Sequence, residues 1–196
     1  MLPEMRAAAD KLIFDVATTK YVASIIGKRA LDRRIDSLGW TVRQLLGHLA
    51  FSLETYADQV AALAAGDDSA ARIDWDAANA EAAEATAKRR LPELLDTMSG
   101  ARDRCIAEFS RLDEQALERQ VRDGMTIRQI VNGCMGHFEE HALDLTDAEP
   151  RLRQDPMVLN WILYADFERH PRLKARQEQL VAEVREWLKS EDDGEE

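Results

Sequence analysis

The chain has 196 residues, with 37 acidic and 26 basic side chains and a net charge of −11. This charge, with no sustained run of Lys or Arg, argues against a sequence-independent nucleic-acid binder and against an anchor to anionic membranes. Small-molecule chemistry or protein contacts fit it better. No segment approaches the ~20 apolar residues of a membrane span, and residues 1–4 do not show the basic and then apolar pattern of a signal peptide. The two cysteines have no disulfide spacing, so we expect a cytoplasmic protein.

Strand signals are nearly absent, so the sequence predicts an all-α fold. The spacing of apolar residues predicts four long helical segments, which in chain order cover 3–26, 41–65, 74–112 and 126–148. Gly27 ends the first segment and Pro150 closes the fourth. Pro92 predicts a kink or a break between Arg90 and Leu91 in the third, because proline lacks a backbone donor. Long amphipathic segments joined by modest loops predict a four-helix bundle.

The chain after residue 150 has a different character. Two further helices are predicted at 156–164 and 172–189. We therefore divide the chain into a bundle at 1–150, a C-terminal helical extension at 151–189 and an acidic, disordered tail at 190–196.

Two helix starts are nearly repeated. Thr41 stands three residues before Gln44, and Thr126 stands three residues before Gln129. This is the spacing of a capping box, in which the Thr hydroxyl accepts from an early N–H group and the Gln reaches back to the cap. The repeat predicts two equivalent helices.

The four histidines include a pair with the spacing of metal ligands. His137 and His141 are four residues apart, so both imidazoles project from one helix face. A catalytic transition-metal site needs at least one more ligand, from His48 or His170. His48 lies seven residues after its cap and His137 eleven, one helical turn apart, so they share a face of the two matched helices. This favours His48 over His170.

These motifs resemble those of the DinB-like superfamily. The segment 40–49 is similar to its second-helix motif, and 137–141 is similar to the HxxxH of its fourth helix. The resemblance covers roughly residues 3–149 and includes the YfiT-like proteins, the mycothiol-dependent maleylpyruvate isomerases and the bacillithiol S-transferases. It implies an up-down-down-up four-helix bundle, a homodimer, and a divalent metal held by His48, His137 and His141. Zinc is the expected metal, with nickel or iron as alternatives.

Several other residues are candidates for supporting roles. Asp144 and Glu140 could orient the histidines from behind, and Ser52, Tyr56 and Asn79 could line the pocket. Four of them have a plainer interpretation: Asp144 and Glu140 as solvated acids, Tyr56 as a core residue, and Asn79 as a capping or exposed side chain. Glu139 and Glu140 are expected to be surface charges, although either could serve as a general base.

The sequence thus predicts a metal-dependent enzyme, a thiol S-transferase or hydrolase, that activates a low-molecular-weight thiol or water against a small electrophilic substrate. The alternative from another class is a non-catalytic bundle that binds or sequesters a small ligand and keeps the metal for structure. An inert dimeric scaffold is a third. A plainer interpretation of the histidines is that carboxylates across the bundle satisfy them without any metal.

Overall fold

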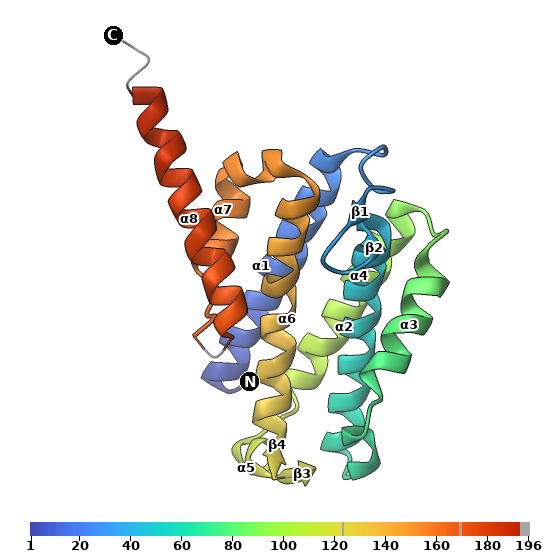
Figure 1. Ribbon diagram of the computed structural model, residues 1–196. Helices are drawn as coiled ribbons and strands as arrows, with labels where there is room; N and C mark the ends of the chain where they lie inside the picture. The colour runs from blue at the N-terminus through green and yellow to red at the C-terminus, as the bar shows by residue number, and fades with distance from the viewer. Residues whose placement is uncertain (123, 169, 193–196) are drawn as a thin grey trace.

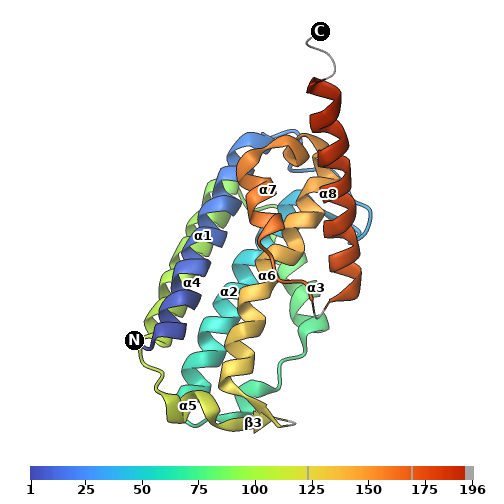
Figure 2. The same cartoon turned by 90° about the vertical axis from the view of Figure 1, so that its left-hand side faces the viewer.

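A computed structural model describes residues 1–122, 124–168 and 170–192. Four long helices form a bundle: α1 (Pro3–Ile26), α2 (Val42–Ala64), α4 (Leu91–Phe109) and α6 (Ile127–Ala148). Helices α1 and α6 run in one direction, and α2 and α4 run in the other (Figure 1, Figure 2). This arrangement confirms the predicted all-α, up-down-down-up bundle.

Two short antiparallel ladders lead into the helices that carry the matched caps. β1 (Arg34–Ile35) pairs with β2 (Trp40–Thr41), and β3 (Gln120–Arg122) pairs with β4 (Met125–Thr126). These ladders are missing from the predicted elements, because strands of two or three residues give no alternating pattern. β2 continues directly into α2 and β4 into α6.

Both predicted capping boxes are present. The backbone N–H of Gln44 donates to Thr41 Oγ1 at 3.2 Å, and the N–H of Thr41 donates to Gln44 Oε1 at 2.9 Å. In the second copy, the N–H of Gln129 donates to Thr126 Oγ1 at 3.3 Å and the N–H of Thr126 donates to Gln129 Oε1 at 2.8 Å. The two histidine-bearing helices therefore begin in the same way, for the same local reason.

The predicted third segment consists of two helices. After the 3-10 turn η1 (Asp68–Ala71), α3 (Trp75–Thr86) runs back along α2, and α4 then begins at Leu91 with Pro92 near its start (Figure 1). The break at Pro92 is as predicted, with Arg90 in an extended conformation. The reversal of direction between α3 and α4 is not predicted, because it depends on packing against α2.

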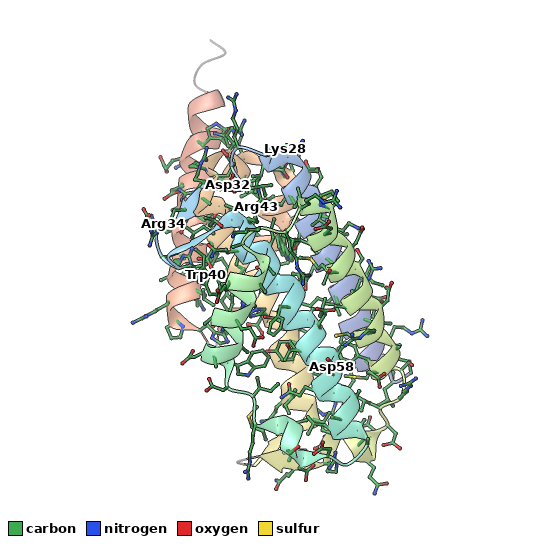
Figure 3. All side chains as sticks on the ribbon, turned by 90° about the vertical axis from the view of Figure 1, so that its right-hand side faces the viewer. Lys28, Asp32, Arg34, Trp40, Arg43 and Asp58 are labelled. Atoms are coloured by element: carbon green, nitrogen blue, oxygen red, sulfur yellow. The ribbon has the colours of Figure 1, made fainter. Side chains whose placement is uncertain are left out.

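Arg43 ties the connector before α2 to the end of α3. Its Nε donates to Asp32 Oδ1 at 3.3 Å, and its Nη1 donates to the backbone carbonyl of Arg89 at 2.9 Å. Figure 3 labels Arg43 and Asp32 at this corner of the molecule, close to Trp40. The contact holds the connector and α3 at the end of the bundle where α2 begins.

The C-terminal extension packs on the bundle. It comprises the 3-10 helix η2 (Pro150–Gln154), α7 (Pro156–Leu163) and α8 (Pro171–Asp192). Helix α7 contacts α1 and α6, and α8 contacts α6 (Figure 2). The backbone of 190–192 continues α8, where a disordered tail is predicted; residues 193–196 lie outside the described residues. Within the described ranges, no helix is both long and apolar enough to cross a membrane.

A buried ionic cluster joins α1, α6 and α7. Lys11 Nζ lies 2.8 Å from Asp15 Oδ2 and 2.9 Å from Glu139 Oε1, and Trp161 Nε1 donates to Asp15 Oδ1 at 2.9 Å. The interpretation of Glu139 as a surface charge is wrong, since only 7% of this residue is exposed. Burial raises the pKa of both carboxyl groups, and the nearby Lys11 ammonium opposes that rise.

Helices α2 and α3 approach closely at Gly47. A Cβ at this position would lie 2.2 Å from Thr86 Oγ1 and 2.3 Å from Thr86 Cβ, so one helix would have to move. The absence of a side chain at Gly47 therefore lets α3 lie against the part of α2 that carries His48.

We predict that Gly47→Ala lowers the free energy of unfolding by a net amount of about 1–2 kcal/mol, because the clash outweighs the gain in helix propensity. Urea unfolding of the metal-free protein measures this. Gly100→Ala in α4 is the matched control: a Cβ there meets nothing within 4 Å, so the control should be neutral or slightly stabilising. Equal stability of Gly47→Ala and wild type would contradict the close approach.

Candidate metal centre

Helices α2 and α6 bring three histidines together. His48 comes from α2, and His137 and His141 come from α6. One nitrogen from each ring can be chosen so that all three lie within 4.8 Å of one another, and the ring centroids are 4.8–5.0 Å apart. This is the set that the matched caps favour in the sequence. The three side chains could hold one divalent metal ion.

The interior environment favours the neutral form of His48 and His137. Burial and the neighbouring His141 lower the pKa of His48 to about 3, although a hydrogen bond with Asn79 acts in the opposite direction. Burial, His141 and His48 likewise hold the pKa of His137 well below its ordinary value. Metal ions bind the neutral form of imidazole, so these two rings need lose no proton at neutral pH.

Asp144 contacts the Nδ1 side of the His141 ring. Its Oδ2 lies 2.9 Å from His141 Nδ1, and the carboxylate is buried. A carboxylate at this position accepts a hydrogen bond from Nδ1–H, which leaves the lone pair on Nε2 of His141. Ser52 Oγ is 3.4 Å from His48 Nδ1, a longer contact of the same kind. Two of the three rings thus have a polar neighbour at Nδ1.

The buried Nε2 of His137 tests whether the three histidines are suited to bind a metal ion. Its Nε2 is buried and has no hydrogen-bond partner among the described residues. An unsatisfied buried nitrogen costs ~1–3 kcal/mol, so such groups call for a partner. The rings of His48 and His141 lie beside it, with centroids 4.8 Å away in each case. Three imidazole nitrogens, one of them otherwise unpaired, fit a divalent transition metal.

The predicted pocket residues lie around this cluster with different degrees of contact. Asn79 is within hydrogen-bonding reach of His48, yet its Oδ1 is buried without a well-formed partner among the described residues. The Tyr56 ring is 6.5 Å from the His137 ring, and burial raises the pKa of its phenol. The Glu140 carboxylate lies 3.9 Å from His170 Nδ1, on the side toward the extension.

Two tryptophans beside the site are missing from the predicted set. The Trp40 ring is 5.0 Å from His48, and the Trp75 ring is 5.1 Å from Tyr56. Trp75 and Asn79 are four residues apart on α3, and that spacing could have identified Trp75 once Asn79 was chosen. Trp40 precedes the helix, so no helical spacing marks it.

Cys134 and His170 do not belong to the histidine cluster. Cys134 is buried, and a hydrogen bond with Cys105 together with burial raises the pKa of its thiol. His170 is exposed near the start of α8. Among the described residues, the potential metal ligands that lie close enough to share one ion are the three cluster histidines, without Cys134 or His170.

For the metal-free protein, we predict that the free energy of unfolding falls as the pH falls from about 6.5 toward 4. His48 has a pKa of about 3 in the fold, far below that of an unfolded histidine. Within this window the unfolded state binds a proton that the folded state does not, so acid favours unfolding. The slope for one such group is about 1.4 kcal/mol per pH unit.

Urea unfolding of the chelator-treated protein across this pH range measures the slope. His48→Gln should show a shallower pH dependence than wild type, and His170→Gln should keep the wild-type slope. Identical slopes for wild type and His48→Gln would be incompatible with a neutral, buried His48.

Comparison with known families agrees with this geometry. The family model described as the DinB superfamily matches residues 16–145, which include all three histidines, the whole of α2 and most of α6. Searches of curated proteins and of solved structures found no match. The matched region ends within α6, so the extension from Pro150 onward lies outside it. The chain belongs to the DinB superfamily.

Proposed function

We propose that this protein is a metal-dependent enzyme that activates a small thiol or a water molecule for transfer to, or hydrolysis of, a small electrophilic substrate. The main support for this proposal is the cluster of His48, His137 and His141. The buried Nε2 of His137 has no hydrogen-bond partner among the described residues. Three protein ligands leave coordination positions open for a reactant, which is typical of catalytic rather than structural metal sites.

The divalent metal, zinc by our first choice, would act as a Lewis acid that lowers the pKa of a bound water or thiol toward neutrality. The histidines would hold it through neutral nitrogens, and Asp144 would keep His141 in the tautomer that binds. Zinc is preferred because imidazole donors suit it and it needs no redox partner; nickel and iron accept the same donors.

The side chains beside the cluster support a role in binding an organic reactant. Tyr56 keeps its proton at neutral pH because burial raises its pKa, so it can donate a hydrogen bond. The buried Oδ1 of Asn79 can accept one. Trp40 and Trp75 add partly buried aromatic surface beside His48 and Tyr56. Together they favour a small molecule that carries both apolar and polar groups.

Elemental analysis of the untagged protein tests the metal site. We predict about one divalent metal per chain in wild type, and a strong loss in His48→Gln, His137→Gln and His141→Gln. His170→Gln changes an exposed histidine outside the cluster and should retain the wild-type content. Full metal content in a triple variant of the three cluster histidines would rule out this site.

An activity screen tests the reaction. We predict that the metal-loaded protein accelerates the reaction of a low-molecular-weight thiol with a small electrophile, or the hydrolysis of that electrophile, and that a chelator abolishes the rate. His48→Gln should lose the rate and His170→Gln should keep it. Saturable binding of the small molecule without turnover would instead identify a binding protein, and would overturn the enzyme proposal.

A further inference from the structure

The C-terminal helix reaches the candidate metal centre through one side chain. Arg176 lies on α8, beyond the region that the family model matches. Its Nη1 is 3.0 Å from Asp144 Oδ1, and the other oxygen of that carboxylate is 2.9 Å from His141 Nδ1. An unbroken path of polar contacts therefore runs from the extension to a cluster histidine.

Arg176 is held between two carboxylates of α6. While Nη1 contacts Asp144, Nη2 lies 2.7 Å from Asp147 Oδ2. Asp144 and Asp147 are three residues apart, so they project from neighbouring positions on the same helix face. The planar guanidinium bridges them with a fixed geometry that a flexible ammonium would not reproduce. The side chain of Asp144 is 7% exposed and that of Arg176 is 31%, so the inner contact is shielded from solvent.

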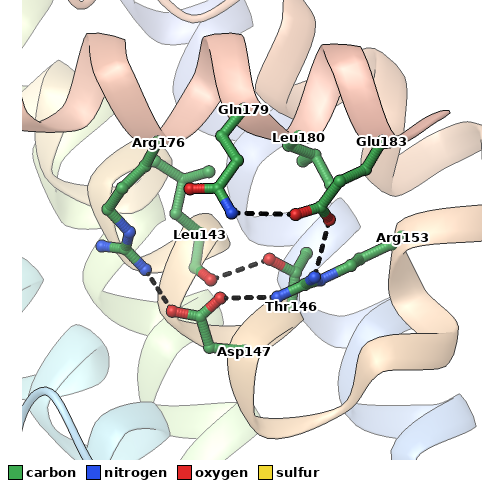
Figure 4. Close-up of a pocket in the computed structure, with 8 residues that line it drawn as sticks. All are labelled: Leu143, Thr146, Asp147, Arg153, Arg176, Gln179, Leu180 and Glu183. Carbon is green, nitrogen blue, oxygen red and sulfur yellow. Dashed lines mark hydrogen bonds and ion pairs between the residues drawn. The ribbon is translucent and has the colours of Figure 1, made fainter. Parts of the chain in front are cut away.

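The surroundings fix Arg176 on α6. Figure 4 shows a polar pocket of about 300 Å³ where α8 faces α6, with Arg176 and Arg153 both directed at Asp147. Arg153 Nη2 is 3.0 Å from Asp147 Oδ1, and its Nη1 is 2.8 Å from Glu183 Oε2 on α8. Leu180 is buried in the core on the same side. Helix α8 is thus anchored by several contacts that do not involve Asp144.

We propose that Arg176 is a positioning residue for the three-histidine site, and that the extension completes the site by fixing Asp144. Without Arg176, the carboxylate keeps its contact with His141 and a 3.5 Å contact with Ser37 Oγ, but loses its charged partner. A carboxylate that can rotate orients the imidazole less strictly, and partners behind a metal ligand affect metal affinity. This inference rests on the proposed function.

Metal affinity of the full, untagged chain tests the proposal. Zinc binding is measured by competition with a chromogenic chelator, and cobalt is used as a spectroscopic probe of ligand geometry. Arg176→Gln should weaken zinc binding by about 3- to 10-fold, less than the roughly 10- to 100-fold expected for Asp144→Asn, which removes a direct partner. The cobalt absorption bands should shift in both variants. Arg176→Lys should give an intermediate affinity.

A matched control and a double variant separate positioning from simple anchoring. Asp147→Asn removes the other carboxylate partner of Arg176 and a partner of Arg153, and should leave zinc affinity within about 2-fold of wild type. Adding Arg176→Gln to Asp144→Asn should cause no further loss, because the effect passes through Asp144. Circular dichroism confirms that the helices remain folded.

Three outcomes would overturn the proposal. Wild-type affinity and an unchanged cobalt spectrum in Arg176→Gln would do so, as would an equal loss from Arg176→Gln with and without Asp144. An equal loss in Asp147→Asn would show that anchoring of α8 is sufficient. Failure of the wild-type protein to bind zinc or cobalt would overturn the proposed function together with this inference, and so is distinguishable from the other results.

Discussion

The burial of three imidazoles between antiparallel helices is the constraint on which much of this molecule depends. Buried polar nitrogens need partners, and burial also opposes the protonated form. His141 is satisfied on one side by Asp144, and His48 has Ser52 within 3.4 Å. His137 has an unpaired nitrogen among the described residues. A metal would resolve that deficit, and the apolar packing of α2 against α6 brings the three rings close enough to share one.

Helix α6 is polar on two sides, which is unusual for a helix in a bundle core. One side carries the histidines, and another carries Glu139, paired with Lys11 and near Asp15. Buried ion pairs add little net stability because desolvation offsets the attraction. The cluster fixes where α7 lies, since Trp161 can bury its indole N–H only by donating to Asp15. Polar contacts thus determine the packing on both sides of α6.

Much of the fold could be predicted because its signals are local. The capping boxes at Thr41 and Thr126 each depend on two residues that are three apart in the sequence. Gly27 and Pro92 each determine where their own helical segment ends or breaks. The histidine cluster could be predicted because the two matched capping boxes fix where α2 and α6 begin. The number of residues from each start then determines which face of its helix carries each histidine. The reversal of direction between α3 and α4 could not be predicted, because it depends on contact with α2. Arg176 carries no signal either, since one Arg in a charged helix shows no partner until α8 lies on α6.

The position of the cluster along the bundle has a consequence for how such proteins diversify. His48 lies seven residues after Thr41, and His141 lies seven residues before Ala148, so both are about 10 Å from the same end of the bundle. The chain leaves α6 at that end. Any segment added after α6 therefore emerges next to the histidines. Exchange of the segment that comes after α6 would therefore change the surroundings of these histidines while leaving every histidine and both helix starts intact.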